Sequence, residues 1–155
     1  MNDYVVRAAT LDDIEILVHH RIAMFTDMGT AFDAPVVTSA FREWARATLA
    51  SGEYVAWVCE TDAGEIVGGG GITLLIWPPG PRDIAGDRIA FVYNVYTEPA
   101  HRKRGIARLI MEAIHAWCKE HGIGALALNA ASAAAHLYKS LGYSDAPSPM
   151  MWKIL

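Results

Sequence analysis

The sequence lacks the features that mark secreted, membrane-spanning or disulfide-stabilised proteins. Its 155 residues include only two cysteines, Cys59 and Cys118. Two cysteines exclude a disulfide framework, and their spacing matches no metal site, so we expect a reducing cytoplasmic location and no bound metal. No apolar run reaches the length of a membrane span, and the first residues carry no signal-peptide pattern. We therefore expect a cytoplasmic protein that has no membrane partner.

Positive charge is also scarce. The chain has 13 Lys and Arg residues against 17 Asp and Glu, which gives a net charge of −4. Nucleic-acid-binding proteins carry a basic surface, so this balance argues against a nucleic-acid partner. The sequence has no low-complexity segment, no long block of one charge and no internal repeat. Since 53% of the residues are apolar, we expect one folded domain over residues 1–155.

The most informative stretch joins a hydrophobic run to a cationic turn and then to a helical pattern. β-Branched and aromatic residues fill Ile89–Thr97, and three cations follow at Arg102-Lys103-Arg104. Gly105 then opens an amphipathic pattern. The apolar residues on one face of that pattern are Ile106, Leu109, Ile110, Ala113 and Trp117. The order predicted is strand, basic turn and helix.

This junction is suited to binding an anion. The first turn of a helix has N–H groups without partners, and the helix dipole adds partial positive charge there. Gly105 has no Cβ, so the backbone can approach an anion closely, and the cations supply charge-assisted donors. A short cationic run is more often a solvated surface, but the strand–glycine–helix order favours a phosphate-bearing ligand. The motif is neither a Walker loop nor a dinucleotide fingerprint.

Two segments of the chain resemble the signatures of one enzyme family. Residues Arg102-Lys103-Arg104-Gly105-Ile106-Ala107 are similar to the Arg/Gln-x-x-Gly-x-Gly/Ala signature of the GCN5-related N-acetyltransferase (GNAT) superfamily. Residues Leu137-Tyr138-Lys139-Ser140-Leu141-Gly142-Tyr143 resemble its second signature, Leu-Tyr-x-x-x-Gly-Phe. Two separate signatures in the right order are more specific than either one. The resemblance implies acetyl-CoA as cofactor, with residues 102–107 around its pyrophosphate.

The predicted order of elements also resembles the GNAT fold. Strands are expected at Tyr4–Ala8, Tyr54–Glu60, Glu65–Trp77, Arg88–Thr97 and Ala125–Asn129. Helices are expected from Leu11 to about Gly29, from a cap at Thr38 or Ser39 to Ser51, from Gly105 to His121, and from Ala133 to Leu141 with Ser132 as cap. Tyr143 and the alternation of Met150, Trp152 and Ile154 add one or two terminal strands. We therefore predict an α/β fold of the GNAT type, an α+β mixed sheet of about six or seven strands flanked by about four helices.

One feature of the third predicted strand has two interpretations. Gly68–Gly71 places four glycines in succession. Glycine in a strand marks a bulge or the close approach of another group, so the run leaves room for a substrate or for packed aromatic rings. The alternative is a flexible, weakly held strand. The sequence alone favours neither.

The resemblance implies roles for individual residues. Backbone groups at Val95 and Thr97 would bind the pantetheine arm, and the Val95 N–H would polarise the thioester carbonyl. Tyr138 matches the tyrosine that protonates the departing thiolate, since a phenol keeps its proton at neutral pH. Ala131 stands where the family often has Asn, so Ser132 is the candidate for that contact. Arg104 stands where glycine is common and adds charge.

The sequence does not identify a general base. Candidates are the carboxylates Asp33, Glu53 and Asp87 and the pair His19 and His20. Neighbouring helical residues point about 100° apart, so the two histidines cannot face one site. We expect at least one of them to be exposed to solvent, and favour exposure of both.

The sequence gives little information about the identity of the acceptor. Asn94 directly precedes the predicted cofactor contacts, and Asp33 and Phe32 lie on the predicted loop Asp27–Pro35, which borders the acceptor side in this fold. Aromatic residues that would line an apolar pocket are Phe25, Phe32, Trp77 and Tyr93. The net negative charge favours a cationic amine by its field.

The resulting hypothesis is an acetyl-CoA-dependent N-acetyltransferase that acts on a primary amine of a small molecule or a peptide by direct attack. The alternative is a non-catalytic coenzyme A-binding sensor or interaction domain of the same fold. A homodimeric interaction protein with a vestigial cofactor site is a third interpretation, although the intact Arg102-x-x-Gly105-x-Ala107 pattern argues against it. The exposed edges of terminal strands would favour a homodimer in any of these cases.

Overall fold

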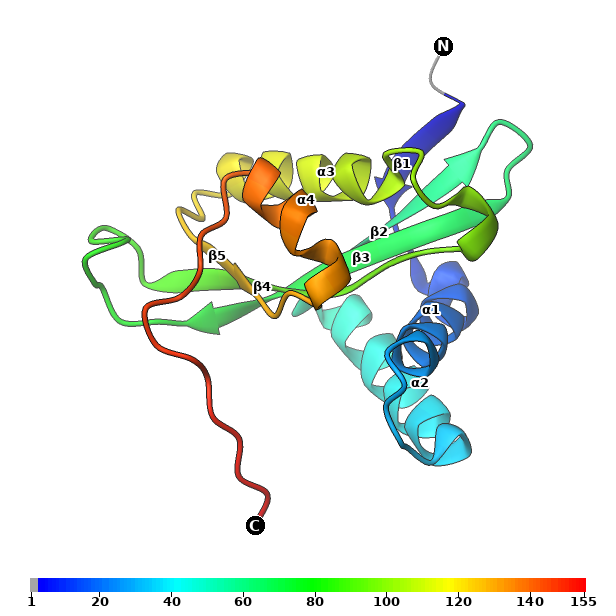
Figure 1. The fold of residues 1–155 in the computed structure, drawn as a ribbon, viewed down its shortest axis with the longest axis horizontal. Coiled ribbons are helices and arrows are strands. Elements are labelled where there is room, and N and C mark those ends of the chain that lie inside the picture. The colour runs from blue at the N-terminus through cyan, green and yellow to red at the C-terminus, as the bar shows by residue number, and fades with distance from the viewer. Residues whose placement is uncertain (1–2) are drawn as a thin grey trace.

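A five-stranded mixed sheet organises the computed structural model, which describes residues 3–155 (Figure 1). Its strands are β1 (Tyr4–Ala8), β2 (Tyr54–Thr61), β3 (Ile66–Ile76), β4 (Arg88–Thr97) and β5 (Leu126–Leu128), in that spatial order. The first four strands pair antiparallel, and β5 pairs parallel to β4. The predicted mixed α/β sheet is thereby confirmed. The first two residues of the expected domain lie outside the described part.

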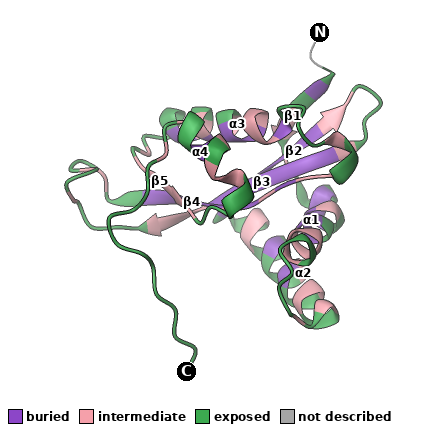
Figure 2. Ribbon diagram, viewed as in Figure 1, coloured by how far each residue is buried: buried purple, intermediate pink, exposed green. Residues whose placement is uncertain are grey.

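Helices cover both faces of this sheet. They are α1 (Ile14–Asp27), α2 (Ala34–Ser51), α3 (Ile106–Glu120) and α4 (Ala135–Ser140). The pair α1 and α2 packs against one face, and α3 and α4 lie on the other (Figure 1). Each face has its own apolar core, one built with Phe41 and Ala45 and the other with Ile110 and Ile114. The strands between the two cores are therefore the most buried elements (Figure 2).

The expectation of six or seven strands is wrong, because the terminal strands are absent. Residues 143–155 form no strand in the structure, and the last of them extend away from the body (Figure 1). Pro147 and Pro149 lie in this segment and cannot donate backbone hydrogen bonds to a ladder. The side chains of Met151 and Trp152 are 92% and 81% exposed, so no core holds the segment against the sheet.

Two predicted helix starts are also wrong. The cap of α2 is Asp33, not Thr38 or Ser39, since the Asp33 carboxylate accepts a hydrogen bond from the Val36 N–H at 3.1 Å. Pro35 belongs to the first turn of α2, where a missing N–H costs little, and not to the loop. Ser132 caps no helix: it begins a 3-10 turn, Ser132–Ala134, that precedes α4.

The four consecutive glycines of β3 make room for the protein's own side chains. A Cβ on Gly71 would lie 2.5 Å from the Tyr54 ring, and one on Gly69 would lie 3.0 Å from His20. Strand β3 is paired on both sides through this region, which argues against a weakly held strand. The interpretation of packed aromatic residues is therefore favoured.

Within residues 3–155, no helix combines the length and the apolar character that a membrane span requires. Both cysteines, Cys59 and Cys118, are buried and free. The cytoplasmic location expected from the cysteine content stays a prediction.

Candidate functional site

Strands β4 and β5 separate early, and a cavity opens where they diverge. Their pairing ends at Val92 and Leu128. Beyond Val92 the backbone of β4 has no strand partner on the β5 side, so part of its polar backbone is free for a ligand. The cavity has a volume of about 850 Å³ and receives residues from α1, β4, α3 and α4. We call it the large cavity.

A bulge in β4 sets the path of this strand. The register between β3 and β4 shifts between Gly69 and Gly71, and Asn94 adopts a left-handed backbone with φ of 57°. Asn94 is 8% exposed, and both the oxygen and the nitrogen of its side-chain amide form hydrogen bonds. Its Nδ2 donates to Tyr54 Oη at 3.2 Å, and its Oδ1 accepts from Arg21. The predicted contact between Asn94 and a substrate stays a prediction, since protein groups already bind its amide.

The basic turn closes one end of the large cavity. Gly105 is the N-cap of α3 with φ of 82°, and Lys103 is also left-handed with φ of 61°. The space around the missing Cβ of Gly105 is open, so the backbone angle is what requires glycine here. No side chain among the described residues caps α3. The N–H groups of its first turn, at Ile106 and Ala107, therefore remain available beside the cavity.

The predicted cations point in different directions. Arg102 lines the cavity, donates from Nε to the Thr97 carbonyl at 2.9 Å and forms an ion pair with Asp27. Lys103 also lines the cavity. Arg104 does not, because it turns toward β1 and donates to Tyr4 Oη at 3.3 Å. The three neighbouring cations therefore do not act as one cluster.

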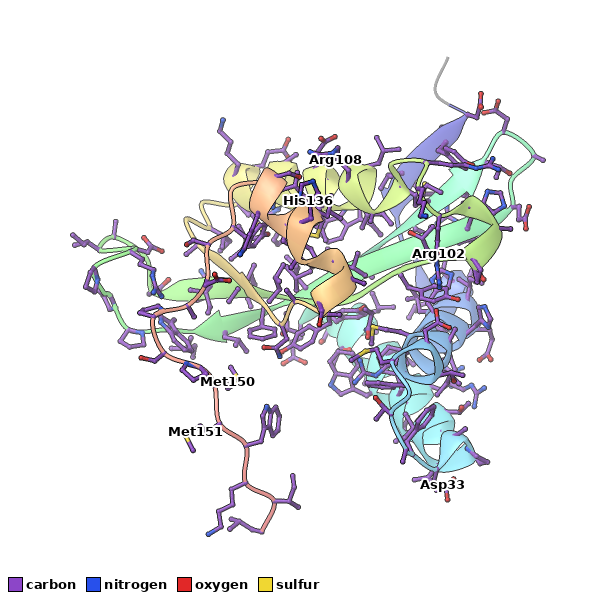
Figure 3. The ribbon with its side chains drawn as sticks, viewed as in Figure 1. Asp33, Arg102, Arg108, His136, Met150 and Met151 are labelled. Carbon is purple, nitrogen blue, oxygen red and sulfur yellow. The ribbon has the colours of Figure 1, made fainter. Side chains whose placement is uncertain are left out.

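Arg108 on α3 also lines the large cavity, although neither sequence motif indicated it (Figure 3). Its guanidinium donates to Ser140 Oγ at 2.7 Å and so links α3 to α4. A signal was present in the sequence, because a cation in the first turn of a helix opposes the helix dipole. Such a residue costs less where a bound anion offsets the repulsion.

Tyr138 lies on α4 and lines the large cavity. It is 7% exposed, its ring meets Tyr143 edge to face at 5.8 Å, and burial raises the pKa of its hydroxyl. No group among residues 3–155 is hydrogen-bonded to this hydroxyl. Ser132 is exposed and does not line the cavity, although Ala131 and Ala133 do.

None of the predicted carboxylates lines the large cavity. Asp33 lies at the far end of α2, away from Arg102 (Figure 3). Glu53 accepts from Ser51 Oγ at 3.0 Å, and Asp87 is exposed beside Arg88. The carboxylate that does line the cavity is Asp27, which is paired with Arg102. No group of three or more His, Cys, Asp or Glu within residues 3–155 could hold a metal ion.

Two of the four predicted aromatic residues line the large cavity and two do not. Tyr93 lines the large cavity, and so does Phe25, whose ring packs against Phe32 at 5.6 Å. Phe32 itself and the half-exposed Trp77 lie outside the lining.

The expectation that both histidines are exposed is wrong for His20. His19 is exposed, and its Nε2 lies 2.6 Å from Glu98 Oε1. His20 is 1% exposed, packs against Tyr96 at 5.2 Å and has no hydrogen-bond partner on either ring nitrogen. Burial lowers the pKa of His20 to about 4. Neither histidine lines the large cavity, so neither is placed as a base there.

A second cavity adjoins the first. It has a volume of about 490 Å³ and lies between α1, α2 and the strands β3 and β4; we call it the small cavity. Arg21, Tyr93 and Asn94 line both cavities. Arg21 was not among the site residues predicted from the sequence. The signal was its position at helical spacing after Ile14 and Val18, which puts a charge on the apolar stripe of α1.

The chain is similar to one protein family in sequence and to several solved structures in fold. The family model described as an acetyltransferase (GNAT) domain matches residues 52–145. A GCN5-related N-acetyltransferase from Ralstonia eutropha JMP134 is 34% identical over 98% of both chains, with a TM-score of 0.86. A predicted acetyltransferase from Clostridium acetobutylicum, solved with acetyl-CoA, is 25% identical over 97% of this chain and 96% of its own, with a TM-score of 0.85.

A more distant structure shares the fold. Glucosamine-6-phosphate N-acetyltransferase from Arabidopsis thaliana is 18% identical over 97% of both chains, with a TM-score of 0.69. No curated protein matches the chain by sequence.

The buried His20 predicts a pH-dependent stability. The unfolded chain binds a proton at this residue near pH 6.5, whereas the folded chain binds it near pH 4. Between these values the unfolded state holds more protons, so the free energy of unfolding falls as the pH decreases, by up to about 3 kcal/mol from this residue. Urea unfolding of the wild type and of His20→Gln from pH 7 to pH 4 measures the difference.

The variant His136→Gln is the matched control, because His136 is exposed on α4 (Figure 3). It should keep the wild-type slope, whereas His20→Gln should flatten it. Equal slopes in all three proteins would mean that His20 has the same pKa in the folded and the unfolded chain.

Proposed function

Because this chain belongs to the GNAT acetyltransferase family, we propose that it transfers the acetyl group of acetyl-CoA to a primary amine of a small molecule or a peptide. The family resemblance inferred from the two signatures is confirmed by the match over residues 52–145. The observation that carries the proposal is the large cavity, because it joins the uncapped start of α3 to Tyr138. We assign the activity to one domain over residues 1–155.

The lining of the large cavity fits the cofactor. The pyrophosphate would be held by the first-turn N–H groups at Ile106 and Ala107 and by the charged groups of Arg102, Lys103 and Arg108. Backbone groups of β4 at Val95 and Thr97, both lining residues, would bind the pantetheine arm. Arg104 and Ser132, which lie outside the lining, are weaker candidates.

The chemistry assigned to the chain is direct acyl transfer. Acetyl-CoA supplies the activated thioester carbonyl. The Val95 N–H would polarise that carbonyl while the amine nitrogen forms the new C–N bond and the C–S bond breaks. Tyr138 would donate its proton to the departing sulfur, because its raised pKa keeps the hydroxyl protonated at neutral pH. The nitrogen of the amine loses its proton to solvent, and the Tyr138 phenolate takes a proton back from solvent. Among the described residues the carboxylate and the histidine that line the cavity are both engaged, Asp27 with Arg102 and His101 with Tyr4.

The basic turn predicts a cofactor-binding defect. Changing Arg102→Ala together with Gly105→Glu removes a cation and places a carboxylate at the start of α3. Calorimetric titration should show acetyl-CoA affinity reduced at least about 100-fold. Arg82→Ala is the control, because Arg82 is exposed and lies in neither cavity, and it should bind as the wild type does. Unchanged binding in the double variant would place the pyrophosphate elsewhere, and no binding by the wild type would refute the proposal.

Tyr138 predicts a separate catalytic defect. Tyr138→Phe removes the proton donor and keeps the ring, so kcat should fall about 100-fold or more while acetyl-CoA affinity stays the same. Free-thiol release across an amine panel measures kcat, and calorimetry measures the affinity. Tyr143→Phe is the control, since Tyr143 bonds His115 at 2.8 Å and does not line the cavity.

The outcome of this pair of measurements separates the two candidate functions. If the wild type binds acetyl-CoA and turns over no amine, the non-catalytic coenzyme A-binding domain becomes the better description. If Tyr138→Phe keeps its kcat, the hydroxyl is not the acid.

We also propose a homodimer that uses the C-terminal segment. This segment exposes Met151, Trp152, Ile154 and Leu155, and among residues 3–155 no strand pairs with the outer edge of β5. An apolar segment and an open strand edge favour association with a second copy. Light scattering of the full chain should give twice the monomer mass, and the variant Met151→Glu with Trp152→Glu should give the monomer mass. A monomeric wild type would exclude the dimer.

A further inference from the structure

We propose that Arg21 binds a carboxylate of the acceptor, so the preferred acceptors are α-amino acids with an apolar side chain. This inference rests on the proposed acetyl transfer and names its substrate class. The observation behind it is an arginine without an ion pair at the junction of the large and small cavities.

The positive charge of Arg21 has no counter-charge among the described residues. Within residues 3–155 no carboxylate lies within ion-pair distance of its guanidinium, although Arg7, Arg42 and Arg102 all have one. Burial lowers the pKa of Arg21, yet an arginine remains charged at neutral pH. A partly buried cation without a counter-charge is costly, and an anionic ligand would remove that cost.

The guanidinium is held in place and keeps free donors. It lies between the rings of Phe25 and Phe41, at 4.8 Å and 5.0 Å from their centroids. One N–H group donates to Asn94 Oδ1, and the described residues offer no acceptor to the others. An arginine presents five N–H donors in a fixed fork, which matches the two oxygens of a carboxylate. The site is thus organised before the ligand arrives.

The lining of the small cavity suits a ligand that carries one negative charge beside an apolar group. Besides Arg21, its walls are mainly apolar or aromatic, from Val36, Val37, Ala40, Phe41, Trp44 and Tyr93. Of the residues that the structure describes, Arg21 is the one charged residue in the lining. A single cation matches a carboxylate better than a phosphate group, which carries more charge and more acceptor oxygens. The volume of about 490 Å³ is typical of small-molecule sites.

The position of Arg21 favours an amine close to the carboxylate. Arg21 bonds Asn94, the residue directly before Val95, whose N–H we assign to the acetyl carbonyl. A carboxylate on Arg21 would therefore bring the amine of the adjacent carbon to the boundary with the large cavity. The apolar side chain would then fill the small cavity. A distant amine, such as that of a lysine side chain, fits this arrangement less well.

The test compares matched acceptors on the full chain. Phenylalanine, tryptophan, leucine and methionine are each compared with their C-terminal amides, which keep the amine and lose the negative charge. Binding to the enzyme saturated with coenzyme A is measured first by calorimetry, and acetylation is measured second by free-thiol release. The wild type should prefer the acids about 10- to 100-fold in kcat/KM, mainly through KM.

Variants of Arg21 distinguish recognition of the acceptor carboxylate from a purely structural role of this residue. Arg21→Gln should lose the preference for the acids, and Arg21→Lys should keep part of it because the charge remains. Arg46→Gln should keep all of it, since Arg46 is an exposed arginine of α2 outside both cavities. Acetyl-CoA affinity is measured in every variant and should stay within about twofold in Arg46→Gln. The Arg21 variants are judged by the ratio of acid to amide within one variant, because both acceptors then meet the same cofactor site.

The outcomes distinguish this inference from the proposed function. Each of three results would overturn the assignment of Arg21. The first is that the amides are bound or acetylated as well as the acids. The others are that no acid binds, or that the preference for acids survives Arg21→Gln. Acetylation of the amides alone would leave the proposed function intact. Acids that bind through Arg21 without being acetylated would support the carboxylate site and refute acetyl transfer to them.

Discussion

The left-handed bulge at Asn94 is the constraint on which the site depends. A regular β4 would continue beside β5, and the large cavity would be closed by strand pairing. A non-glycine residue in the left-handed region costs about 1 kcal/mol, and here two side-chain hydrogen bonds offset that cost. One comes from Arg21 on α1 and the other goes to the hydroxyl of Tyr54 on β2. The bond that holds the bulge therefore also fixes the guanidinium between the two cavities.

Features with local causes could be predicted from the sequence. Thr10 caps the 3-10 turn Leu11–Asp13 that leads into α1, because its partner in the capping box, Asp13, is only three residues away. The turn Thr61–Gly64 joins β2 to β3, with Gly64 left-handed and its N–H donating to the Thr61 carbonyl. Gly105 likewise begins α3, since its backbone angle excludes most other residues. In each case the determining interactions lie within one turn of the chain.

Features that depend on distant contacts could not be predicted in this way. His20 is buried because Tyr96 and the glycines of β3 close over it, and nothing near it in the sequence indicates this. Arg21 lies on the apolar stripe of its helix, where a charge is tolerated only because Phe41 and Asn94 contact it. The prediction of terminal strands is wrong for the same reason, because an alternating hydrophobic pattern alone does not supply a neighbouring strand to pair with.

The two cavities differ in the charge they can neutralise, and this difference would keep the two ligands apart. The large cavity has several cations and the start of α3 at one end, which suits the multiple charges of a pyrophosphate. The small cavity has one cation enclosed by aromatic rings, which suits a single charge on an apolar molecule. A polyphosphate in the small cavity would leave charge unpaired in an apolar setting, and a carboxylate at α3 would use few of the donors. Under the proposed function, charge number, more than cavity size, would therefore separate cofactor from acceptor.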